Sequence, residues 1–509
     1  MRSSLLRLAV ALIAFTTATE AKAQSDARAR GFDQYVAQAV KDWNVAGLAI
    51  AVVKDGKIAF AKGYGVREAG KPEPVDTATI FAIASTTKAM TAAAIAMLVD
   101  EGKVKWDDPV TKHLPSFQLY DPYATREVTV RDLLTHRAGL PNADYLWYVS
   151  DFPAEEMMGR LRLIKPEYSL RSSFIYQNVM YIAAGQVVEA ASGMPWAKFI
   201  QTRIFDPLGM KNSYPIAAQV PASANKATPH YHYGGDTIAA VKRDQAQAIG
   251  PAGDVWSTVS DMSKWMLFLL DSARVGGRQL IKPATFAELF TPQTVVPPDE
   301  FYVSQALTKP QWRTYGLGWF QHDYQGKKLD FHTGSLAGMV AILGLVRNER
   351  FGVFVLANVD HVEVRHALMY KAIDTWLGNP PRDWSRELRT LYQARRARND
   401  SVRAAGEDRR ITGTKPSLAL AKYAGTYESP IVGRVTLRES NGKIRFDAGN
   451  ALKGELEHVQ YDRFRVRWDD RWQGTDVVTF TIGDGVPSAV GFGGFTFSRV
   501  PDVPAAVTR

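Results

Sequence analysis

A serine and a lysine three residues apart suggest the first chemistry in this sequence. Ser85 and Lys88 follow the apolar segment 80–84 and open a run of apolar residues with helical spacing. Positions three apart share one face of a helix, so the hydroxyl and the amine would be neighbours. A serine hydroxyl is a weak nucleophile at neutral pH unless a nearby base accepts its proton. Unpaired N–H groups in the first helical turn would also favour a developing oxyanion.

The same Ser-x-x-Lys spacing occurs twice more, at residues 223–226 and 440–443. The first copy lies in a stretch without a clear period. The second contains Asn-Gly between alternating segments, which is typical of a hairpin turn. We interpret both as surface positions. For Ser85 the alternative is a helix N-cap with a solvated lysine one turn on, so further motifs must decide.

Tyr176 and Asn178 form the only Tyr-x-Asn in the chain. A phenol can relay protons if a nearby positive charge lowers its pKa, and Lys88 would supply that charge. Asn178 would donate to a substrate carbonyl and hold Lys88. If the tyrosine stood alone, a half-buried residue at a helix start would be the preferred interpretation.

His332, Thr333, Gly334 and Ser335 follow an extended segment. A residue on an edge strand can bind an extended substrate backbone, and the glycine would let that substrate approach closely. The backbone N–H of Ser335 would be the second oxyanion donor, beside that of Ser85. The alternative for His332 is a satisfied histidine at a strand end.

The elements that must position these residues lie before Pro380, where strands are predicted near both ends of the region and helices between them. A hairpin is predicted over 47–66 and further strands over 328–357, while 125–270 is mostly helical in pattern. This outline predicts an α+β domain with a helical insertion, whose sheet joins distant chain segments. Two loops, 133–141 and 250–258, are assigned to turns and packing, without a catalytic role.

The pattern changes after Asn379-Pro380-Pro381, which is a clean break. Residues 385–410 hold eight arginines against four acids, which favours a solvated helix and linker. From about Tyr423 onward, short strands and turns predict a separate all-β module, either a small barrel or a sandwich. We expect five strands there, at 434–439, 443–447, 463–468, 477–482 and 489–497.

The N-terminus has the pattern of a secretory signal over residues 1–23. Arg2 and Arg7 precede an apolar run at 8–15, and Ala21-Lys22-Ala23 resembles a cleavage site. The apolar run is well short of the ~20 residues that span a membrane. We therefore expect an exported protein without an integral membrane span, located in the periplasm or secreted.

The composition excludes several classes of site. The chain has no cysteine, so it has no disulfide, no thiolate metal site and no lipid-modified cysteine. The net charge of +10 is modest for 509 residues, and no recognition module accompanies it, so nucleic-acid binding is not expected. No metal and no cofactor are expected either.

Taken together, Ser85-x-x-Lys88, Tyr176-x-Asn178 and His332-x-Gly334 resemble the three signature elements of serine β-lactamases and penicillin-binding proteins. The Tyr-x-Asn form is similar to the class C β-lactamase group. That group also holds DD-carboxypeptidases, D-aminopeptidases and esterases, and is often called the S12 peptidase family. The resemblance covers about residues 30–378. The tail, with Tyr423-Ala424-Gly425-Thr426-Tyr427, resembles the lipocalin-like domain appended to some such hydrolases.

The resemblance implies a fold and a division into domains. An antiparallel sheet flanked by helices, with a helical subdomain, would precede a small all-β barrel-like domain. The expected order is a signal peptide at 1–23, a β-lactamase-like domain at 24–380, an arginine-rich helical linker at 381–411 and a lipocalin-like domain at 412–509.

The resemblance also implies a serine hydrolase that works through an acyl-enzyme. Ser85 would attack the carbonyl, with Lys88 or Tyr176 taking its proton. The N–H groups of Ser85 and Ser335 would hold the oxyanion. Tyr176 would pass a proton to the leaving group and later activate water. The substrate would be oriented by Asn178, His332, Thr333 and Gly334.

One departure from the class C pattern concerns the substrate. Class C β-lactamases carry a lysine where this chain has His332, and a histidine is largely neutral at pH 7 and a weaker anchor for a carboxylate. We therefore expect hydrolysis of small peptide, amide or ester substrates, including D-residue or cell-wall-type peptides. A weak class C-type β-lactamase and a slow-acylating penicillin-binding or sensor protein are the alternatives. A further hypothesis is that the C-terminal module caps or narrows the cleft and selects short substrates.

Overall fold

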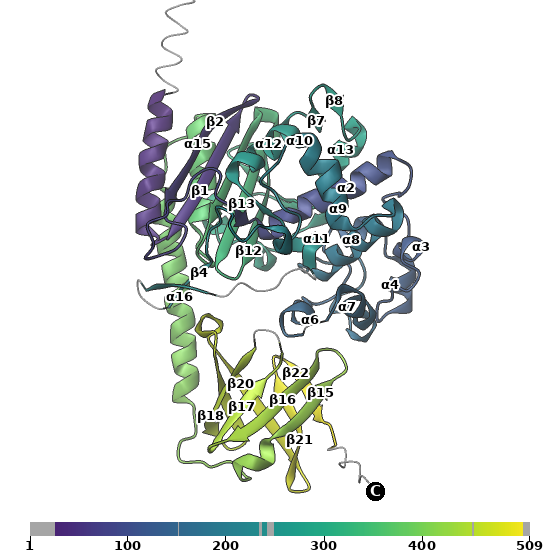
Figure 1. Cartoon of the computed structure of the whole chain (residues 1–509), viewed down its shortest axis with the longest axis vertical. Helices are drawn as coiled ribbons and strands as arrows, with labels where there is room; N and C mark the ends of the chain where they lie inside the picture. The colour runs from purple at the N-terminus through teal and green to yellow at the C-terminus, as the bar shows by residue number, and fades with distance from the viewer. Residues whose placement is uncertain (1–25, 151, 234–236, 242–248, 450–451, 502–509) are drawn as a thin grey trace, which may run out of the picture.

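The computed structural model describes residues 26–501, except for 151, 234–236, 242–248 and 450–451 (Figure 1). The segment with the pattern of a secretory signal lies outside this range. None of the described helices is long and apolar enough to cross a membrane. The chain forms an N-terminal α+β domain and a C-terminal barrel, as the sequence pattern predicted.

An eight-stranded antiparallel sheet is the centre of the N-terminal domain. The hairpin near the N-terminus pairs with β14, so the sheet joins the two ends of the domain. The strands, in spatial order, are β2 Lys57–Gly65, β1 Gly47–Lys54, β14 Phe351–Ala357, β13 Met339–Val346, β12 Lys327–Leu336, β11 Phe320–Tyr324, β10 Arg313–Tyr315 and β9 Thr294–Val295.

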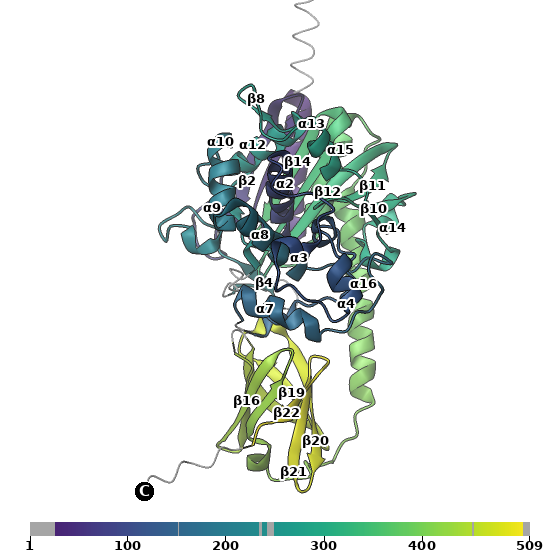
Figure 2. The ribbon, with the colours of Figure 1, turned by 90° about the vertical axis from the view of Figure 1, so that its right-hand side faces the viewer.

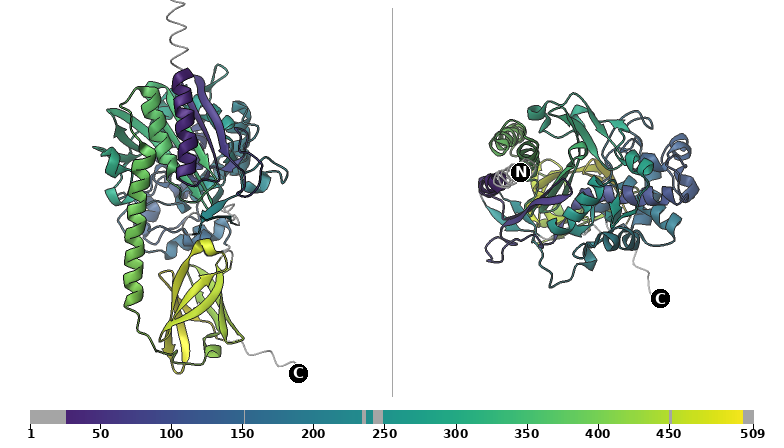
Figure 3. Two further views of the ribbon diagram at one scale, coloured as in Figure 1. Left: turned by 90° about the vertical axis from the view of Figure 1, so that its left-hand side faces the viewer. Right: turned by 90° about the horizontal axis from the view of Figure 1, so that it is seen from above.

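The sheet is covered by helices on both faces (Figures 1 and 3). Successive side chains of a strand point to opposite faces, and β1 therefore supplies two cores. Leu48, Ile50 and Val52 join the core beneath the helix of residues 26–42 and α15 Val364–Leu377. Their neighbours on the strand join the other core, beneath α2 Lys88–Asp100, α8 Val179–Ser192 and α12 Val259–Leu270.

Short helices complete the helical subdomain around α2 and α8. They are α3 Val110–His113, α4 Pro122–Glu127, α5 Val130–Leu133, α6 Tyr145–Tyr148, α7 Ala154–Arg160, α9 Trp196–Ile200, α10 Asp206–Leu208, α11 Gly250–Gly253 and α13 Pro283–Leu289. The short helix α14 Gln305–Thr308 belongs to the other core, where Leu307 packs. Smaller strands are β3 Phe81–Ala82, β4 His230–His232, β5 Ile238–Ala240, β6 Trp256–Ser257, β7 Arg274–Val275 and β8 Arg278–Gln279.

The C-terminal module is a closed eight-stranded barrel. The prediction of five strands was incomplete, because β15 and β18 were not recognised and 489–497 is a hairpin rather than one strand. Gly493 and Gly494, with φ of +57° and +81°, form its tight turn. The strands are β15 Gly425–Ser429, β16 Gly433–Ser440, β17 Lys443–Asp447, β18 Lys453–Gln460, β19 Arg463–Trp468, β20 Thr475–Gly483, β21 Val486–Phe492 and β22 Phe495–Arg499.

The arginine-rich segment forms α16 Trp384–Asp408, which runs along the N-terminal domain and on beside the barrel (Figures 2 and 3). The barrel also contacts the segment around α6 and α7. The hydroxyl of Ser150 donates to the main-chain oxygen of Val432 at 2.7 Å, and the rings of Tyr145 and Phe495 lie 4.4 Å apart. These contacts hold one end of the barrel against the helical subdomain.

Candidate active site

Ser85 lies on a short 3₁₀ turn, Ala84–Thr87, that leads directly into α2. Ala84 has a φ of +47°, a conformation that non-glycine residues rarely adopt and that is often found at functional sites. Gly334 on β12 lies against this turn. A Cβ at Gly334 would be 2.3 Å from the Ile83 carbonyl oxygen. The sequence interpretation had this glycine admitting the substrate, whereas it admits the turn that carries the serine.

Lys88 is fully buried and its amine connects three elements. The Nζ atom donates to the Oγ of Ser85 at 3.0 Å, to the Oδ1 of Asn178 at 2.7 Å and to the main-chain oxygen of Ala252 at 2.7 Å. Burial lowers the pKa of Lys88 to about 7, against the opposing effect of the Asp144 carboxylate. A substantial fraction of the amine is therefore neutral at physiological pH, and the neutral form can accept the Ser85 proton.

Tyr176 is the third side chain brought together with Ser85 and Lys88. Its ring centroid lies 4.9 Å from the Nζ of Lys88, and the neighbouring Ser85 side chain acts to lower the pKa of its phenol. Burial raises the pKa of Tyr176 well above its ordinary value. From the sequence, a nearby positive charge was expected to lower this pKa, whereas desolvation by burial raises it. The phenol is therefore a neutral hydrogen-bond donor near pH 7, and the amine is the group that titrates there.

Asn178 holds Lys88 and is itself held by a carboxylate that the sequence analysis missed. Its Nδ2 donates to the Oδ1 of Asp144 at 2.8 Å, while its Oδ1 accepts from Lys88. Asp144 also accepts from the indole of Trp147 at 3.0 Å. No motif marks Asp144, which comes from a loop and reaches the site only through the fold.

His332 is brought near these residues, but its imidazole is buried and does not line the cleft described below. The Nδ1 atom lies 2.6 Å from the Thr333 carbonyl oxygen, which can only accept, so Nδ1 carries the proton. The Nε2 atom then accepts from the Tyr315 hydroxyl at 3.0 Å. Burial, with a smaller contribution from Lys88, lowers the pKa of His332 to about 3. From the sequence, this imidazole was expected to orient substrate. In the structure it is a neutral core residue that does not reach the cleft.

The strand that carries His332 is an edge only in part. The ladder between β11 and β12 ends at the Phe320–Phe331 pair, whereas β13 pairs with β12 to its end. Residues 332–336 therefore pass beside the 3₁₀ turn of Ser85 on their other side. Thr333 and Ser335 line the cleft there, and the Thr333 hydroxyl lies 2.6 Å from that of Tyr302.

A buried guanidinium supports this strand end from behind. The Nη1 of Arg365 donates to the Gly334 carbonyl oxygen and, at 2.9 Å, to the Ser335 hydroxyl. Glu363 accepts from Arg365 Nη2 at 3.0 Å and lies 2.6 Å from His366 Nδ1. Arg365 and His366 hold the pKa of Glu363 well below its usual range despite burial. Because the Gly334 carbonyl and the Ser335 N–H belong to one peptide unit, the guanidinium polarises that N–H.

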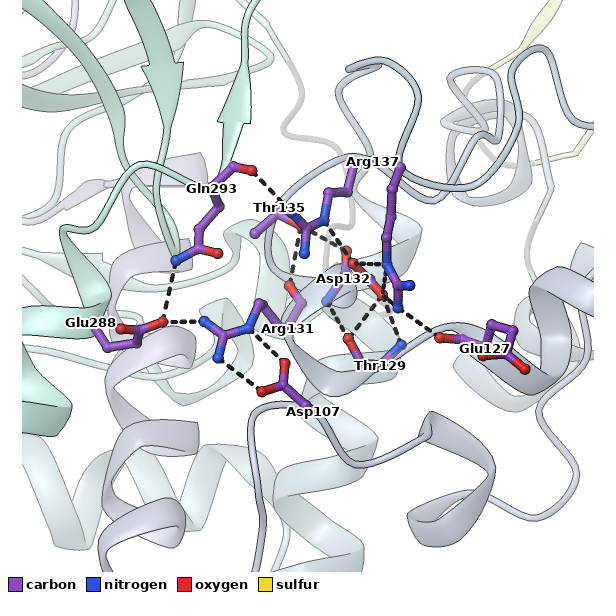
Figure 4. A network of polar contacts seen from close by, with 10 residues as sticks. Asp107, Glu127, Thr129, Arg131, Asp132, Thr135, Arg137, Glu288 and Gln293 are labelled. Carbon is purple, nitrogen blue, oxygen red and sulfur yellow. Dashed lines mark hydrogen bonds and ion pairs between the residues drawn. The ribbon is translucent and has the colours of Figure 1, made fainter.

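The loop after α5 is fixed by a polar network around Asp132, which is fully buried. Asp132 accepts from the main-chain N–H and the hydroxyl of Thr129 and from the Nε of Arg137 at 2.7 Å (Figure 4). Arg171 adds further bonds to the same carboxylate. Arg137 also donates to the Gln293 main-chain oxygen, which joins the loop to the segment before β9.

This loop places His136 beneath the site. Its ring lies 4.4 Å from that of Tyr176, and its Nδ1 accepts from the main-chain N–H of Gln177 at 2.9 Å. Burial lowers the pKa of His136, so the imidazole is neutral. The two loops that were assigned to packing therefore contact the site: one supports Tyr176, and the other supplies the Ala252 carbonyl that accepts from Lys88.

Ser85 opens into a cleft of about 570 Å³. Tyr176, Asn178, Thr333 and Ser335 line it with Ser85, whereas Lys88, His332 and Gly334 lie behind its wall. Among the described residues that line it, none is a lysine or arginine, and four are acids: Asp144, Asp299, Glu300 and Asp360. The described residues contain no group of three or more histidine, aspartate or glutamate side chains that could hold a metal ion.

The barrel contributes one of the described residues that line this cleft. Trp472 lines it from a 3₁₀ turn, Arg471–Gln473, at the rim of the barrel. The indole Nε1 is buried and has no hydrogen-bond partner within the described part of the chain. The hydroxyl of Tyr148 donates to Gln473 at 3.1 Å and holds the turn. No sequence signal marks Trp472, because its role depends on how the barrel is docked.

Sequence models of two known families match the two parts of the chain. The sequence model of the beta-lactamase family matches residues 32–406, and that of a domain of unknown function, DUF3471, matches residues 409–499. "Unguisins hydrolase ungD" of Aspergillus violaceofuscus is 28% identical over 503 residues, covering 91% of this chain and 87% of that protein. "Protein flp" of Staphylococcus aureus is 24% identical over 339 residues, covering 64% of this chain and 62% of that protein.

Two solved structures share the fold of most of the chain. An octameric penicillin-binding protein homologue from Pyrococcus abyssi aligns with a TM-score of 0.61 at 23% identity, covering 92% of this chain and 99% of that one. The crystal structure of SurE aligns with a TM-score of 0.57 at 20% identity, covering 94% and 99%. At these identities the likeness shows a common fold, and it extends over both domains.

Proposed function

The chain belongs to the beta-lactamase family of serine hydrolases, whose sequence model spans residues 32–406, and we propose that it hydrolyses peptide, amide or ester bonds through an acyl-enzyme on Ser85. The resemblance inferred from the three motifs is thereby confirmed at the level of the family. Relatives that are named hydrolases support the general activity, and the substrate and mechanism below are our proposal.

One observation supports the proposal above the rest: a buried amine with a pKa of about 7 lies 3.0 Å from a serine hydroxyl at the wall of a cleft. The sequence left open whether Lys88 or Tyr176 is the base. The lowered pKa of Lys88 and the raised pKa of Tyr176 favour Lys88 for acylation.

The proposed reaction has two stages. The neutral amine of Lys88 takes the Ser85 proton as the hydroxyl attacks the substrate carbonyl. The N–H groups of Ser85 and Ser335 stabilise the tetrahedral oxyanion. Tyr176 passes its proton to the departing amine or alcohol and takes up the proton that Lys88 received from Ser85, so the amine is neutral again and the phenol protonated before the second stage. In the second stage the same groups activate a water that hydrolyses the ester on Ser85.

The charge of the cleft supports a substrate other than a typical β-lactam. A carboxylate near the scissile bond would meet several acids, and among the described lining residues it would meet no lysine or arginine. Peptides with a free amino group, neutral amides and esters are compatible with these acids. D-residue and cell-wall-type peptides fall within this class. The secretory pattern of residues 1–23 supports an exported enzyme, in the periplasm or secreted.

The test is hydrolysis of p-nitrophenyl acetate, D-alanine p-nitroanilide and nitrocefin by the wild-type protein and by Ser85→Ala. We expect turnover of the ester and the anilide, little of nitrocefin, and loss of all turnover in Ser85→Ala. Ser440→Ala is the matched control, since Ser440 belongs to another Ser-x-x-Lys segment, on the barrel. Normal turnover by Ser85→Ala would refute the proposal, and a burst without turnover would indicate a slow acylator.

A further inference from the structure

A second cavity adjoins the cleft on the side of α16. It has a volume of about 730 Å³ and lies between α16, residues 42–44 and residues 301–303. Phe301, Tyr302 and His361 line both this cavity and the cleft of Ser85, so the two spaces share a wall. We call this second space the α16 cavity.

The face of α16 that lines the α16 cavity changes from apolar to basic along the helix. At its start, Trp384 and Leu388 are buried in the core. Arg389 and Arg396 then line the cavity and, being seven residues apart, lie on one face. Arg403, a further seven residues on, lines the next cavity beside the barrel. A helix face turned toward protein is usually apolar, so arginines at this spacing point to an anionic counterpart.

The carboxylates that line the α16 cavity are already engaged by other groups. Glu363 is held by Arg365 and His366. The Oδ1 of Asp42 accepts from the Nε2 of Gln38 at 2.8 Å. Arg365 offsets the charge of Glu363, whereas the bond from a neutral amide leaves the Asp42 carboxylate charged. Among the described lining residues, three arginines, Arg389, Arg395 and Arg396, therefore face one uncompensated carboxylate.

The arginines of the cavity are accessible. Arg389 donates to the main-chain oxygen of Asp42 at 2.6 Å, which orients its guanidinium without neutralising it. The side chains of Arg395 and Arg396 are exposed toward solvent. Trp43 and Tyr392 add aromatic surface to the same cavity. Guanidinium groups beside aromatic rings suit a ligand with a carboxylate and an apolar or aromatic side chain.

The cleft and the α16 cavity have opposite charge. The cleft is lined by Asp144, Asp299 and Glu300, whereas the cavity is lined by arginines. A linear peptide whose scissile bond lies at Ser85 carries complementary charges at its two ends, positive toward the acidic cleft and negative toward the arginines. Its acyl side leads to the terminal ammonium, and its leaving side leads to the terminal carboxylate.

We propose that the α16 cavity is a substrate subsite that binds the carboxylate end of the leaving group, so that the preferred substrate is a linear peptide with a free C-terminus. This inference rests on the function proposed for Ser85. The Tyr302 hydroxyl, paired with that of Thr333, lies on the wall over which the peptide passes.

The test separates binding from catalysis by using the full-length Ser85→Ala protein. Titration calorimetry compares D-alanyl-glycyl-glycyl-phenylalanine with the same peptide ending in a carboxamide. We expect the free acid to bind about tenfold more tightly, as a charge-assisted guanidinium–carboxylate contact implies. Adding Arg389→Gln and Arg396→Gln should abolish this preference, and Arg396→Gln alone should reduce it. Arg398→Gln is the matched control, because it removes the same charge from α16 away from the cavity.

Three results would overturn the subsite: equal affinity for acid and amide, an equal loss of preference in Arg398→Gln, or no binding of either peptide at millimolar concentration. Failure of the proposed function has a different signature, namely hydrolysis of p-nitrophenyl acetate by Ser85→Ala. The two proposals can therefore fail separately.

Discussion

The two domains of this protein differ in how many charged groups they bury beside their apolar cores. The interior around Ser85 contains groups that are costly to bury, among them Lys88, Asp132 and Arg365, and each has hydrogen-bond partners. The barrel interior is filled by aromatic and aliphatic side chains. Its rings contact one another at 5.0–5.8 Å in the group Phe446, Trp468 and Phe492.

This difference suggests different consequences for substitutions in the N-terminal domain around Ser85 and in the barrel. Removing a partner from a buried polar network changes protonation and geometry, whereas removing a ring from an apolar core leaves a void. Eight-stranded barrels are just wide enough for side chains to fill. The barrel would therefore contribute to function at its rim, where Trp472 lines the cleft, and not through its interior.

The largest effect is expected from the amine itself. Lys88→Met should lower kcat for p-nitrophenyl acetate by about 10³-fold, since a positioned general base contributes on this scale. Circular dichroism and thermal unfolding should show a folded protein. Lys264→Met is a suitable control, because Lys264 forms an ion pair with Asp261 at 2.8 Å and does not line the cleft.

The same prediction has a pH dependence. Burial lowers the pKa of Lys88 to about 7, and only the neutral amine accepts the serine proton. Activity should therefore be present above this pKa and fall about tenfold per pH unit below it. Measuring kcat/KM from pH 5 to 9 tests this. A rise centred near pH 10 instead would assign the base to a group with an ordinary lysine or tyrosine pKa.

Much of the site could be predicted from the sequence, because its core is local or motif-based. Ser85 and Lys88 are three residues apart on a turn that leads into a helix, and Tyr176 and Asn178 share a second motif. The residue types and spacing of these motifs were enough to predict the fold class and to select Ser85, Lys88 and Tyr176 as candidates. The fold then placed the hydroxyl, amine and phenol in contact.

The rest depended on tertiary structure. Asp144 and Trp472 carry no motif and meet the site through a loop and a docked domain. His332 was expected to contact substrate, but the fold buries its imidazole, which bonds to Tyr315 instead. The short β15 strand was missed although it forms a local hairpin with β16, and its second pairing, with β22, closes the barrel.

A second prediction concerns the peptide unit between Gly334 and Ser335. Arg365→Lys keeps the charge but loses the fork that bonds the Gly334 carbonyl, the Ser335 hydroxyl and Glu363 together. We expect kcat to fall roughly tenfold with little change in KM, because the polarised N–H acts on the oxyanion in the transition state. Steady-state kinetics with p-nitrophenyl acetate measures both constants.

A merely structural role for Arg365 would give a different pattern. It would lower the melting temperature and the active fraction, without a change in kcat per titrated active site. Arg347→Lys is the control, since Arg347 pairs with Asp330 at 3.2 Å and lies outside the cleft. An unchanged kcat in Arg365→Lys would show that the guanidinium does not assist the oxyanion donor.

A smaller effect is expected at the rim of the barrel. Trp472→Phe keeps a ring in the cleft wall but removes the buried indole N–H, which has no partner in the described structure. We expect this N–H to donate to substrate, so KM for D-alanine p-nitroanilide should rise by roughly threefold with kcat nearly unchanged, because one neutral hydrogen bond has about this value. Tyr461→Phe, at an exposed turn of the barrel, should change neither constant.

The smallest effect on turnover is expected from a substitution in the barrel core, although it should lower stability strongly. Phe446→Ala removes a fully buried ring from the barrel core and should lower the free energy of unfolding by about 3–5 kcal/mol. Below its lowered melting temperature, the variant should keep the wild-type kcat, since no reactive group lies in the barrel. Val477→Ala, at an exposed site on β20, should leave stability nearly unchanged. A loss of kcat in folded Phe446→Ala would break the division between the two domains, because it would mean that packing inside the barrel is transmitted through Trp472 to the reacting groups.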